Sequence, residues 1–315
     1  MDRDLLERLS VITAEEQEIL DGRTYIDRSL YMTGSRNIIS CDRLLRPGQF
    51  VGLRPHTRFI EFPEHTHDFI EMVYMCSGKT THIINDREFV LSEGDLMLLG
   101  RNTRQSVQPA RREDIAVNII IRPSFMASTL PFIGEDYTPL RQFIVDCLAG
   151  KKSDSLFFRV GDILPIRNQI ESLIYILTDE KPYSRNIIRL LIGLIFAELL
   201  DYTERLTTDT AGQNAMVSVL RYIEAHYRDG TLEEIAAKLG YEPASLSRII
   251  INTLGESFTG LIQEKRLSQA AWLLKNTDCR IEEVASAVGY ENKSYFYRLF
   301  AARYGKSPKK YRDTV

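Results

Sequence analysis

An internal repeat in the last third of the chain limits the possible folds more than any other feature of the sequence. The segment Leu232–Glu242 recurs as Ile281–Glu291, 49 residues later, and six of the eleven positions are identical. After the shared Gly-Tyr-Glu turn the offset becomes 50, so that Leu246–Ile250 aligns with Phe296–Phe300. A duplication of this length predicts two copies of one small supersecondary unit.

The first copy has the local chemistry of two helices joined by a tight turn. Thr231 is a favourable N-cap, and Glu234 stands three residues later, as in a capping box. Gly240 follows the apolar stripe at a position that favours a positive φ angle, which ends the helix. Pro243 suits the first turn of a second helix. This order predicts a helix-turn-helix unit, whose second helix enters the major groove of DNA.

The repeat therefore predicts two helix-turn-helix units, at about 231–252 and 281–302, joined by one helix over 259–276. The distribution of charge agrees with DNA binding. Residues 216–315 contain 15 Lys+Arg against 12 Asp+Glu, although the whole chain has a net charge of −3. From Asn292 to Arg312 there are seven basic residues and no acidic one, which suits phosphate contact. The alternative is a helical bundle with a solvated basic face.

The segment from Gly289 to Arg312 (GYENKSYFYRLF…YGKSPKKYR) resembles the corresponding region of AraC/XylS-type transcription regulators. The resemblance covers 215–315 and implies a DNA-binding domain of seven helices. By position, it implies that the two recognition helices contact DNA through Ala244, Ser245, Ser247, Arg248, Asn292, Lys293, Ser294, Tyr297 and Arg298. From the basic segment after them we expect Lys306, Lys309 and Lys310 to contact phosphates. The apolar stripe assigns four residues of these helices to the core, namely Leu246, Ile249, Phe296 and Leu299.

The N-terminal two-thirds has a different pattern. Between about 25 and 122, short runs rich in Val, Ile, Phe and Tyr are separated by turn residues, which favours a sandwich or small barrel. The expected strands lie at 50–53, 59–62, 69–75, 80–84, 88–91, 95–99 and 115–121. Strand patterns stop at about 138, and long helical patterns follow at 163–177 and 185–206. The predicted fold class is α+β, with the domains 1–24 (helical arm), 25–160 (cupin-like effector-binding barrel), 161–206 (helical dimerisation region), 207–214 (linker) and 215–315 (DNA-binding domain).

The string His65-Thr-His67-Asp-Phe-Ile-Glu71, followed by Gly78, is similar to the first motif of the cupin barrel. On one strand, positions 65, 67 and 71 would share a face. Two imidazoles and a carboxylate are also the ligands of many Fe(II) sites. Where the second cupin motif usually supplies a further His, this chain has Gln105, a poor ligand for a transition metal.

Three interpretations of this string remain: a metal site, hydrogen-bonded barrel residues, or the lining of a pocket for a small polar effector. We favour the pocket, and we expect no metal, no cofactor and no catalytic residue. The expected effector-binding residues are His65, His67, Glu71, His82, Gln105 and Arg58. A charge cluster near an edge strand, such as that around Arg58, is also common protection against aggregation.

The sequence predicts a ligand-responsive transcription regulator, not an enzyme, whose effector is a small polar molecule such as a carbohydrate. The expected partners are double-stranded promoter DNA, the effector, a second copy of the chain and RNA polymerase, with no membrane. Four cysteines with no Cys-x-x-Cys motif fit a reducing cytoplasm. Two alternatives stay open: a ligand-independent DNA-binding protein with the barrel as a dimer scaffold, and a metal-binding cupin fused to a DNA-binding domain.

Overall fold

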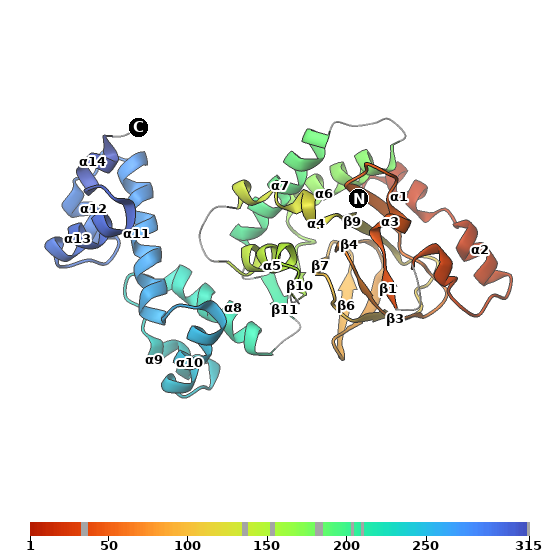
Figure 1. The fold of residues 1–315 in the computed structure, drawn as a ribbon, viewed down its shortest axis with the longest axis horizontal. Coiled ribbons are helices and arrows are strands. Elements are labelled where there is room, and N and C mark those ends of the chain that lie inside the picture. The colour runs from red at the N-terminus through yellow and green to blue at the C-terminus, as the bar shows by residue number, and fades with distance from the viewer. Residues whose placement is uncertain are drawn as a thin grey trace. The chain divides into compact units, whose positions relative to one another are not determined.

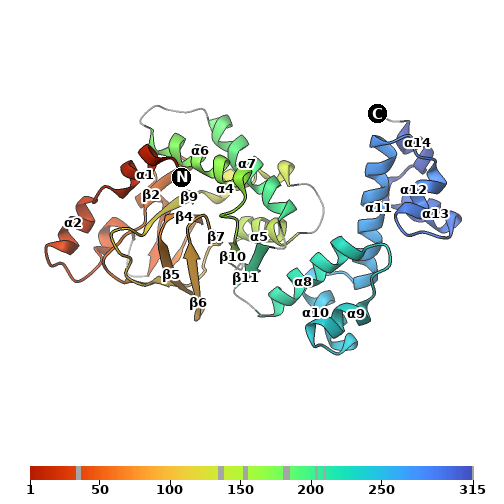
Figure 2. The same cartoon turned by 180° about the vertical axis from the view of Figure 1, so that it is seen from behind.

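The computed structural model describes residues 1–32, 37–133, 138–151, 155–179, 185–202, 205–208 and 211–313. The chain forms two compact units, Met1–Ala211 and Gly212–Val315, and each is described by itself (Figures 1 and 2). The predicted α+β class is confirmed, because the first unit is rich in sheet and the second is helical. None of the helices in the described ranges combines the length and the apolar character that a membrane span requires.

Two sheets form the N-terminal unit. The six-stranded sheet has the order β11-β10-β7-β4-β9-β2, and the five-stranded sheet has the order β1-β3-β8-β5-β6. The strands are β1 (Ile38–Ile39), β2 (Val51–Pro55), β3 (Phe62–His67), β4 (Ile70–Ser77), β5 (Lys79–Ile84), β6 (Arg87–Ser92), β7 (Leu96–Leu99), β8 (Gln105–Val107), β9 (Ile115–Ile121), β10 (Leu156–Phe158) and β11 (Leu206–Thr208).

Residue patterns explain which strands are central. β5 alternates exposed or half-buried residues with buried ones, as expected for a sheet with one solvated face. In β4 every residue up to Cys76 is buried, and β4 pairs with both β7 and β9. One face of the six-stranded sheet is covered by helices, since α6 (Leu164–Thr178) packs against β2 and α7 (Arg185–Asp201) packs on α6.

Several predicted strands differ from those observed. The segment 59–62 is not a strand, and β3 begins only at Phe62. The prediction that strands stop at about 138 is wrong, because β10 and β11 extend the larger sheet. Each of these has only three residues, and a run as short as Leu156–Phe158 has no periodicity by which it could be recognised.

The prediction of one strand through His65 and Glu71 is also wrong. The chain turns at Asp68 and Phe69, so that His65 and His67 lie on β3 of one sheet and Glu71 lies on β4 of the other. The Asp68 carboxylate fixes this turn, because it accepts hydrogen bonds from Ser40 Oγ and from the backbone N of Cys41, both at 2.8 Å.

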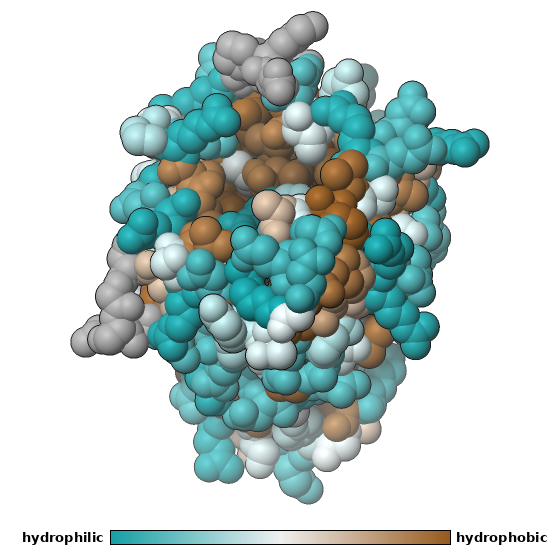
Figure 3. Space-filling view, turned by 90° about the vertical axis from the view of Figure 1, so that its right-hand side faces the viewer, coloured by the Kyte–Doolittle hydropathy of each residue, from teal (hydrophilic) through white to brown (hydrophobic). Residues whose placement is uncertain are grey.

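The remaining helices of this unit surround the sheets. The arm over residues 1–24 contains two short helices, because Thr13 starts a new one with a capping box that includes Glu16. The helices and 3₁₀ turns are α1 (Arg3–Ser10), α2 (Ala14–Leu20), η1 (Arg28–Leu30), α3 (Cys41–Leu44), α4 (Pro123–Met126), η2 (Leu130–Phe132) and α5 (Pro139–Leu148). Hydrophilic residues dominate the face drawn in Figure 3, and hydrophobic residues gather in a hollow in its upper half.

The expected linker, 207–214, lies at the division between the two units. Its first two residues belong to β11, and its last four begin the first helix of the second unit. Residues 209 and 210 lie outside the described residues.

Seven helices make up residues 211–313. They are α8 (Ala211–His226), α9 (Leu232–Leu239), α10 (Pro243–Leu254), α11 (Phe258–Asn276), α12 (Ile281–Ala287), α13 (Lys293–Tyr304) and α14 (Pro308–Arg312). The unit has two hydrophobic cores, and α11 contributes to both, with Phe258 and Leu261 in one and Leu267 and Leu274 in the other. Figures 1 and 2 show α11 running between the α9–α10 pair and the α12–α13 pair.

Candidate effector pocket and DNA-binding surface

Four of the five histidines of the chain gather in the N-terminal unit. His56 follows β2, His65 and His67 lie on β3, and His82 lies on β5; all four are buried. Their rings approach one another in pairs, with centroids 4.9 Å apart for His65 and His67 and 5.4 Å apart for His56 and His82. Burial lowers the pKa of each of them, that of His65 to about 4, so the imidazoles are neutral at neutral pH.

The Gln105 amide lies at the centre of the two imidazoles and the carboxyl group of the His-x-His-x3-Glu string. Its Nε2 donates a hydrogen bond to Glu71 Oε2 at 2.9 Å and lies 3.2 Å from His65 Nε2 and 3.3 Å from His67 Nε2. Gln105 and His65 are direct partners across β8 and β3. The three side chains therefore converge on an amide, and among the described residues no group of three His, Cys, Asp or Glu side chains is arranged to hold a metal ion.

Glu71 is the carboxyl group of this cluster. Burial raises its pKa to about 7, while hydrogen bonds from Gln105 and Asn118 act in the opposite direction. Burial thus favours the protonated form of this carboxyl group, which is able to donate a hydrogen bond as well as to accept one.

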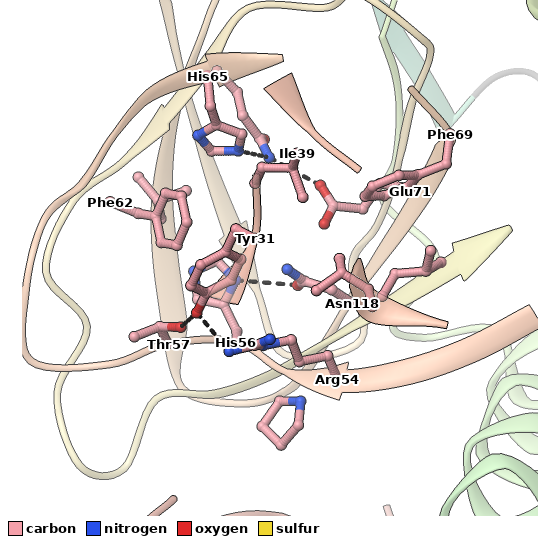
Figure 4. A pocket seen from close by; sticks show the side chains of 15 residues that line it. Tyr31, Ile39, Arg54, His56, Thr57, Phe62, His65, Phe69, Glu71 and Asn118 are labelled. Atoms are coloured by element: carbon pink, nitrogen blue, oxygen red, sulfur yellow. Dashed lines mark hydrogen bonds between the residues drawn. The ribbon is translucent and has the colours of Figure 1, made fainter. Parts of the chain in front are cut away.

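A cavity of about 30 Å³ lies beside this cluster, enough for roughly two water molecules. His65, Glu71 and Gln105 line one end of it, and Arg54 and Tyr31 lie at the other end (Figure 4). The apolar part of the lining contains Ile39, Leu44, Phe62, Phe69, Val107 and Ile120. Two lining atoms, His56 Nε2 and Gln105 Oε1, have no hydrogen-bond partner in the described structure.

The structure separates the six predicted effector-binding residues into two groups. His65, Glu71 and Gln105 line the cavity, whereas His67, His82 and Arg58 do not. His67 and His82 are fully buried; His67 contacts Gln105, and His82 Nε2 lies 3.0 Å from Thr80 Oγ1.

The expected role of Arg58 in effector binding does not fit its surroundings. Its Nε and Nη2 donate to the Glu16 carboxylate at 2.7 and 2.9 Å, and further bonds reach the carbonyl oxygens of Ser10, Val11 and Arg112. With side-chain exposures of only 3% and 1% for Arg58 and Glu16, the pair is buried. Arg58 therefore holds the N-terminal helices on the barrel, a role that neither its position nor its charge indicated in the sequence.

Several lining residues were absent from the predicted set. Asn118 Oδ1 accepts a hydrogen bond from His56 Nδ1 at 3.1 Å, and Asn118 is the only polar residue of β9. That polar break in an apolar strand is the signal by which it could have been found. Arg54 Nη2 donates to Tyr31 Oη at 2.7 Å and to Glu15 Oε2 at 2.9 Å. Tyr31 gives no comparable signal, because it follows a short 3₁₀ turn and is distant in the sequence from Phe62 of β3, against which its ring packs.

In the second unit, α9 and α10 form the first helix-turn-helix. Gly240 joins them with a φ of 70°, as predicted, and Thr231 Oγ1 accepts a hydrogen bond from the Glu234 backbone N at 3.3 Å. Leu246 is fully buried in α10. On the outer face of this helix Ala244 and Arg248 are exposed, while Ser245 and Ser247 are half-buried.

The second helix-turn-helix consists of α12 and α13. Gly289 in its turn has a φ of 88°, and Phe296 is fully buried. Of the predicted contact residues, Lys293, Ser294 and Arg298 are exposed. Asn292 caps the helix by accepting a hydrogen bond from the Tyr295 backbone N at 3.0 Å.

Two tyrosines of α13 differ in their surroundings. Tyr297, a predicted contact, is half-buried and packs against the second hydrophobic core. Tyr295, which the predicted set does not include, is 41% exposed on the outer face. Further along, Lys306, Lys309 and Lys310 are exposed, and Lys306, Ser307 and Lys310 line an open hollow at the start of α14.

Two family models match the chain. Residues 47–196 match the AraC-like ligand binding domain, and residues 235–314 match a helix-turn-helix domain. The HTH-type transcriptional activator RhaR of Escherichia coli O1:K1 / APEC is 24% identical over 259 residues, which are 80% of this chain and 87% of RhaR.

Among solved structures, the C-terminal domain of AraT, a response regulator from Geobacillus stearothermophilus, is 37% identical, with a TM-score of 0.32. The match covers 34% of this chain and 89% of that domain. ToxT from Vibrio cholerae is 20% identical over 84% of this chain and 98% of its own, with a TM-score of 0.34.

Proposed function

The chain belongs to the AraC family of DNA-binding transcription regulators and carries the family's N-terminal ligand-binding domain, and from this premise we propose that the barrel cavity binds a small polar effector that changes how the second unit binds promoter DNA. The observation that carries the proposal is the cavity itself. Its lining includes two buried polar atoms without partners, and a buried polar atom without a partner costs about 1–3 kcal/mol. Both atoms are acceptors, because the neutral His56 ring donates its Nδ1 proton to Asn118 Oδ1, so two ligand hydroxyl groups would supply the two partners.

The effector is a neutral molecule with several hydroxyl groups, such as a carbohydrate. Neutral imidazoles, amides and a carboxyl group whose protonated form is favoured by burial accept and donate hydrogen bonds, which matches hydroxyl chemistry. Phe62 and Phe69 supply an apolar wall for the carbon face of such a ligand. The cavity holds roughly two water molecules, so it is too small for a carbohydrate as it stands. Arg54 and Tyr31 must therefore move aside when such a ligand binds.

A thermal-shift screen with neutral sugars and polyols tests this proposal. We expect one of them to raise the melting temperature of the purified protein, since a ligand that binds only the folded state stabilises it. His65→Ala should abolish that shift and leave DNA binding intact. Val90→Ala, on the exposed side of β6, is the matched control and should respond like the natural protein. A screen that gives no shift while anionic metabolites do would contradict the neutral class.

The same protein tests the metal interpretation. We expect His67→Ala to remain folded and to bind DNA while its response to the effector changes, because His67 supports Gln105. Chelator treatment should change nothing. Protein that carries about one equivalent of iron, zinc or manganese, with a response lost on chelation, would instead establish a metal site. The role proposed here is regulatory and not catalytic, and its place is the cytoplasm, where promoter DNA and RNA polymerase are found.

The regulator acts as a homodimer through α7. Ile187, Leu190 and Leu194 form one stripe of this helix, and they are 42%, 54% and 47% exposed. Exposed apolar stripes of this kind mark association surfaces, and joining two DNA-binding units raises the affinity through effective concentration. Leu190→Glu should convert the dimer to a monomer in sedimentation experiments, and a protein that sediments as a monomer before substitution would exclude this interface.

A further inference from the structure

An aromatic side chain lies beside Arg298, one of the residues that we expect to contact DNA from the second recognition helix. Tyr295 and Arg298 are one turn apart on α13, and the Arg298 Cζ lies 5.3 Å from the centre of the Tyr295 ring. At the far end of the ring, Gln263 of α11 donates a hydrogen bond from Nε2 to Tyr295 Oη at 3.1 Å. Gln263 therefore contacts Tyr295, and Tyr295 contacts Arg298. The three side chains are exposed or half-buried and come from two helices.

We propose that Tyr295 is a positioning residue for DNA recognition: Gln263 fixes the ring, and the ring holds the Arg298 guanidinium in place for contact with a base edge. This inference rests on the proposed function, in which the second unit binds promoter DNA, and on the expectation that α13 is its second recognition helix and that Arg298 reads a base there. It assigns to Tyr295 and Gln263 an indirect role, through Arg298, rather than a contact of their own with a base.

The ring is well suited to this role because it is held at both ends. The backbone N of Tyr295 is bonded to the Asn292 cap at 3.0 Å, and its hydroxyl group is bonded to Gln263. On its inner side the ring faces Tyr290, which is 5% exposed, with 6.2 Å between the ring centres. A tyrosine has only two side-chain torsions to fix, so little conformational freedom is lost by holding it.

The helix that supplies Gln263 is a firm support. The neighbouring residue, Glu264, accepts a hydrogen bond from Arg303 Nη2 of α13 at 2.8 Å, so that α11 and α13 are joined at two consecutive positions. α11 is also the helix that contributes to both hydrophobic cores. Arg298 is thus oriented by the rigid part of the unit rather than by its own flexible side chain.

Restriction of the guanidinium matters because base reading by arginine is geometric. Two parallel hydrogen bonds to guanine O6 and N7 require the planar group in one orientation. An arginine that is free in solution loses considerable rotamer entropy when it is fixed. A guanidinium that already lies on a ring face loses less, and that difference appears as affinity for the correct base.

The first helix-turn-helix offers an internal comparison. At the offset of 50, Tyr295 corresponds to Ser245 and Arg298 corresponds to Arg248. Ser245 has no ring, and among the described residues no aromatic ring lies under the Arg248 guanidinium. The two arginines therefore share a position in the repeat and differ in their support.

A double-mutant cycle on the full-length protein tests the proposal, with a duplex selected by that protein from a random pool as the probe. We expect Tyr295→Ala to weaken binding about threefold, the size of an exposed cation–π contact. It should relax the preference at the same base pair as Arg298→Ala. In the Arg298→Ala background it should have no further effect. Tyr295→Phe and Gln263→Met each remove only the hydrogen bond, so both should give the same smaller loss, and the two together no more than one.

Two controls and two outcomes complete the test. Gln269→Met, six residues further along α11, should bind normally, and a cycle of Ser245→Ala with Arg248→Ala should be additive. If Tyr295→Ala weakens binding equally with and without Arg298, then Tyr295 contacts DNA directly and the positioning role is wrong. If Arg298→Ala itself leaves affinity and preference unchanged, then the base-reading role of Arg298 fails, which is a distinct result.

Discussion

The helices α10 and α13 have the same length, twelve residues, and each ends at a glycine, with φ angles of 73° at Gly255 and 67° at Gly305. Their buried residues correspond at the offset of 50, Leu246 with Phe296 and Ile250 with Phe300. Their outer residues do not. The first helix presents small side chains beside Arg248, whereas the second presents Lys293, Ser294, Tyr295 and Arg298.

This difference shows which constraints the two copies share. Inner positions must fill a core, so their apolar character is retained even where a leucine has become a phenylalanine. Outer positions are constrained only by what they bind, so the two faces are free to diverge. The first face, with Ala244 exposed, suits thymine methyl groups and hydroxyl contacts, and the second suits guanine and phosphate.

The strongest test of the comparison asks whether both helix-turn-helix motifs bind DNA at once. Two recognition helices on one face of the DNA require half-elements about one helical turn apart, about 34 Å. Insertion of five base pairs between the elements turns one of them to the opposite face. We expect binding in a gel-shift titration to fall about a thousandfold, toward the level of non-specific DNA. Unchanged affinity would mean that only one of the two helix-turn-helix motifs contacts DNA.

The turn glycines provide the second test, because equivalent residues have unequal surroundings. A Cβ added at Gly289 would lie 2.7 Å from the carbonyl oxygen of Arg228, whereas one added at Gly240 would meet nothing within 4 Å. Both replacements by alanine suffer the left-handed backbone, about 1–2 kcal/mol. We expect Gly240→Ala to cost only that, and Gly289→Ala about 3 kcal/mol, since a close contact with backbone is added.

Denaturant titration followed by tryptophan fluorescence measures these two costs. Trp272 is the only tryptophan of the chain and lies on α11, so its emission reports the second unit alone. Equal losses for the two alanine variants would show that the Arg228 carbonyl moves away at little cost and that the turns are equivalent after all.

The third test separates the two arginines. We expect Arg298→Ala to cost about 1–3 kcal/mol of specific binding and to relax the sequence preference. Arg248→Ala should cost less, because no ring restricts that guanidinium. Binding selection with each variant gives both the affinity and the preference. Equal effects, or a preference that Arg298→Ala leaves unaltered, would place both arginines on phosphates.

Local rules account for the parts of the fold that the sequence predicted. The positive φ at Gly240, the cap at Thr231 and the buried Leu246 each depend on residues within a few positions of one another. The same is true of Phe296, which falls on the apolar stripe of its helix.

The contacts that sequence reasoning missed join distant segments. Arg58 pairs with Glu16, 42 residues away, and Tyr295 is bonded to Gln263, 32 residues away. The convergence of His65 and Glu71 was expected for the wrong reason, since they face each other from two sheets and not along one strand. Periodicity defines the face on which a side chain lies, but it does not define what packs against that face.

The smallest expected effect concerns the basic segment that follows the second helix-turn-helix and has no counterpart after the first. Lys309 is exposed on α14, beside Lys310 and close to the hollow that Lys306 lines. A lysine on a phosphate contributes the same attraction on every sequence, because the backbone charge doesn't depend on the bases. Lys309→Ala should therefore weaken specific and random duplexes alike, by less than about tenfold, and should reduce the slope of log affinity against log salt by about 1. Titrations at four salt concentrations on both duplexes measure this, with Arg298→Ala as the contrasting variant. A Lys309→Ala protein that keeps its salt slope, or that loses affinity for one sequence only, would show that the segment reads bases. The contrast drawn between the two helix-turn-helix motifs would then be wrong.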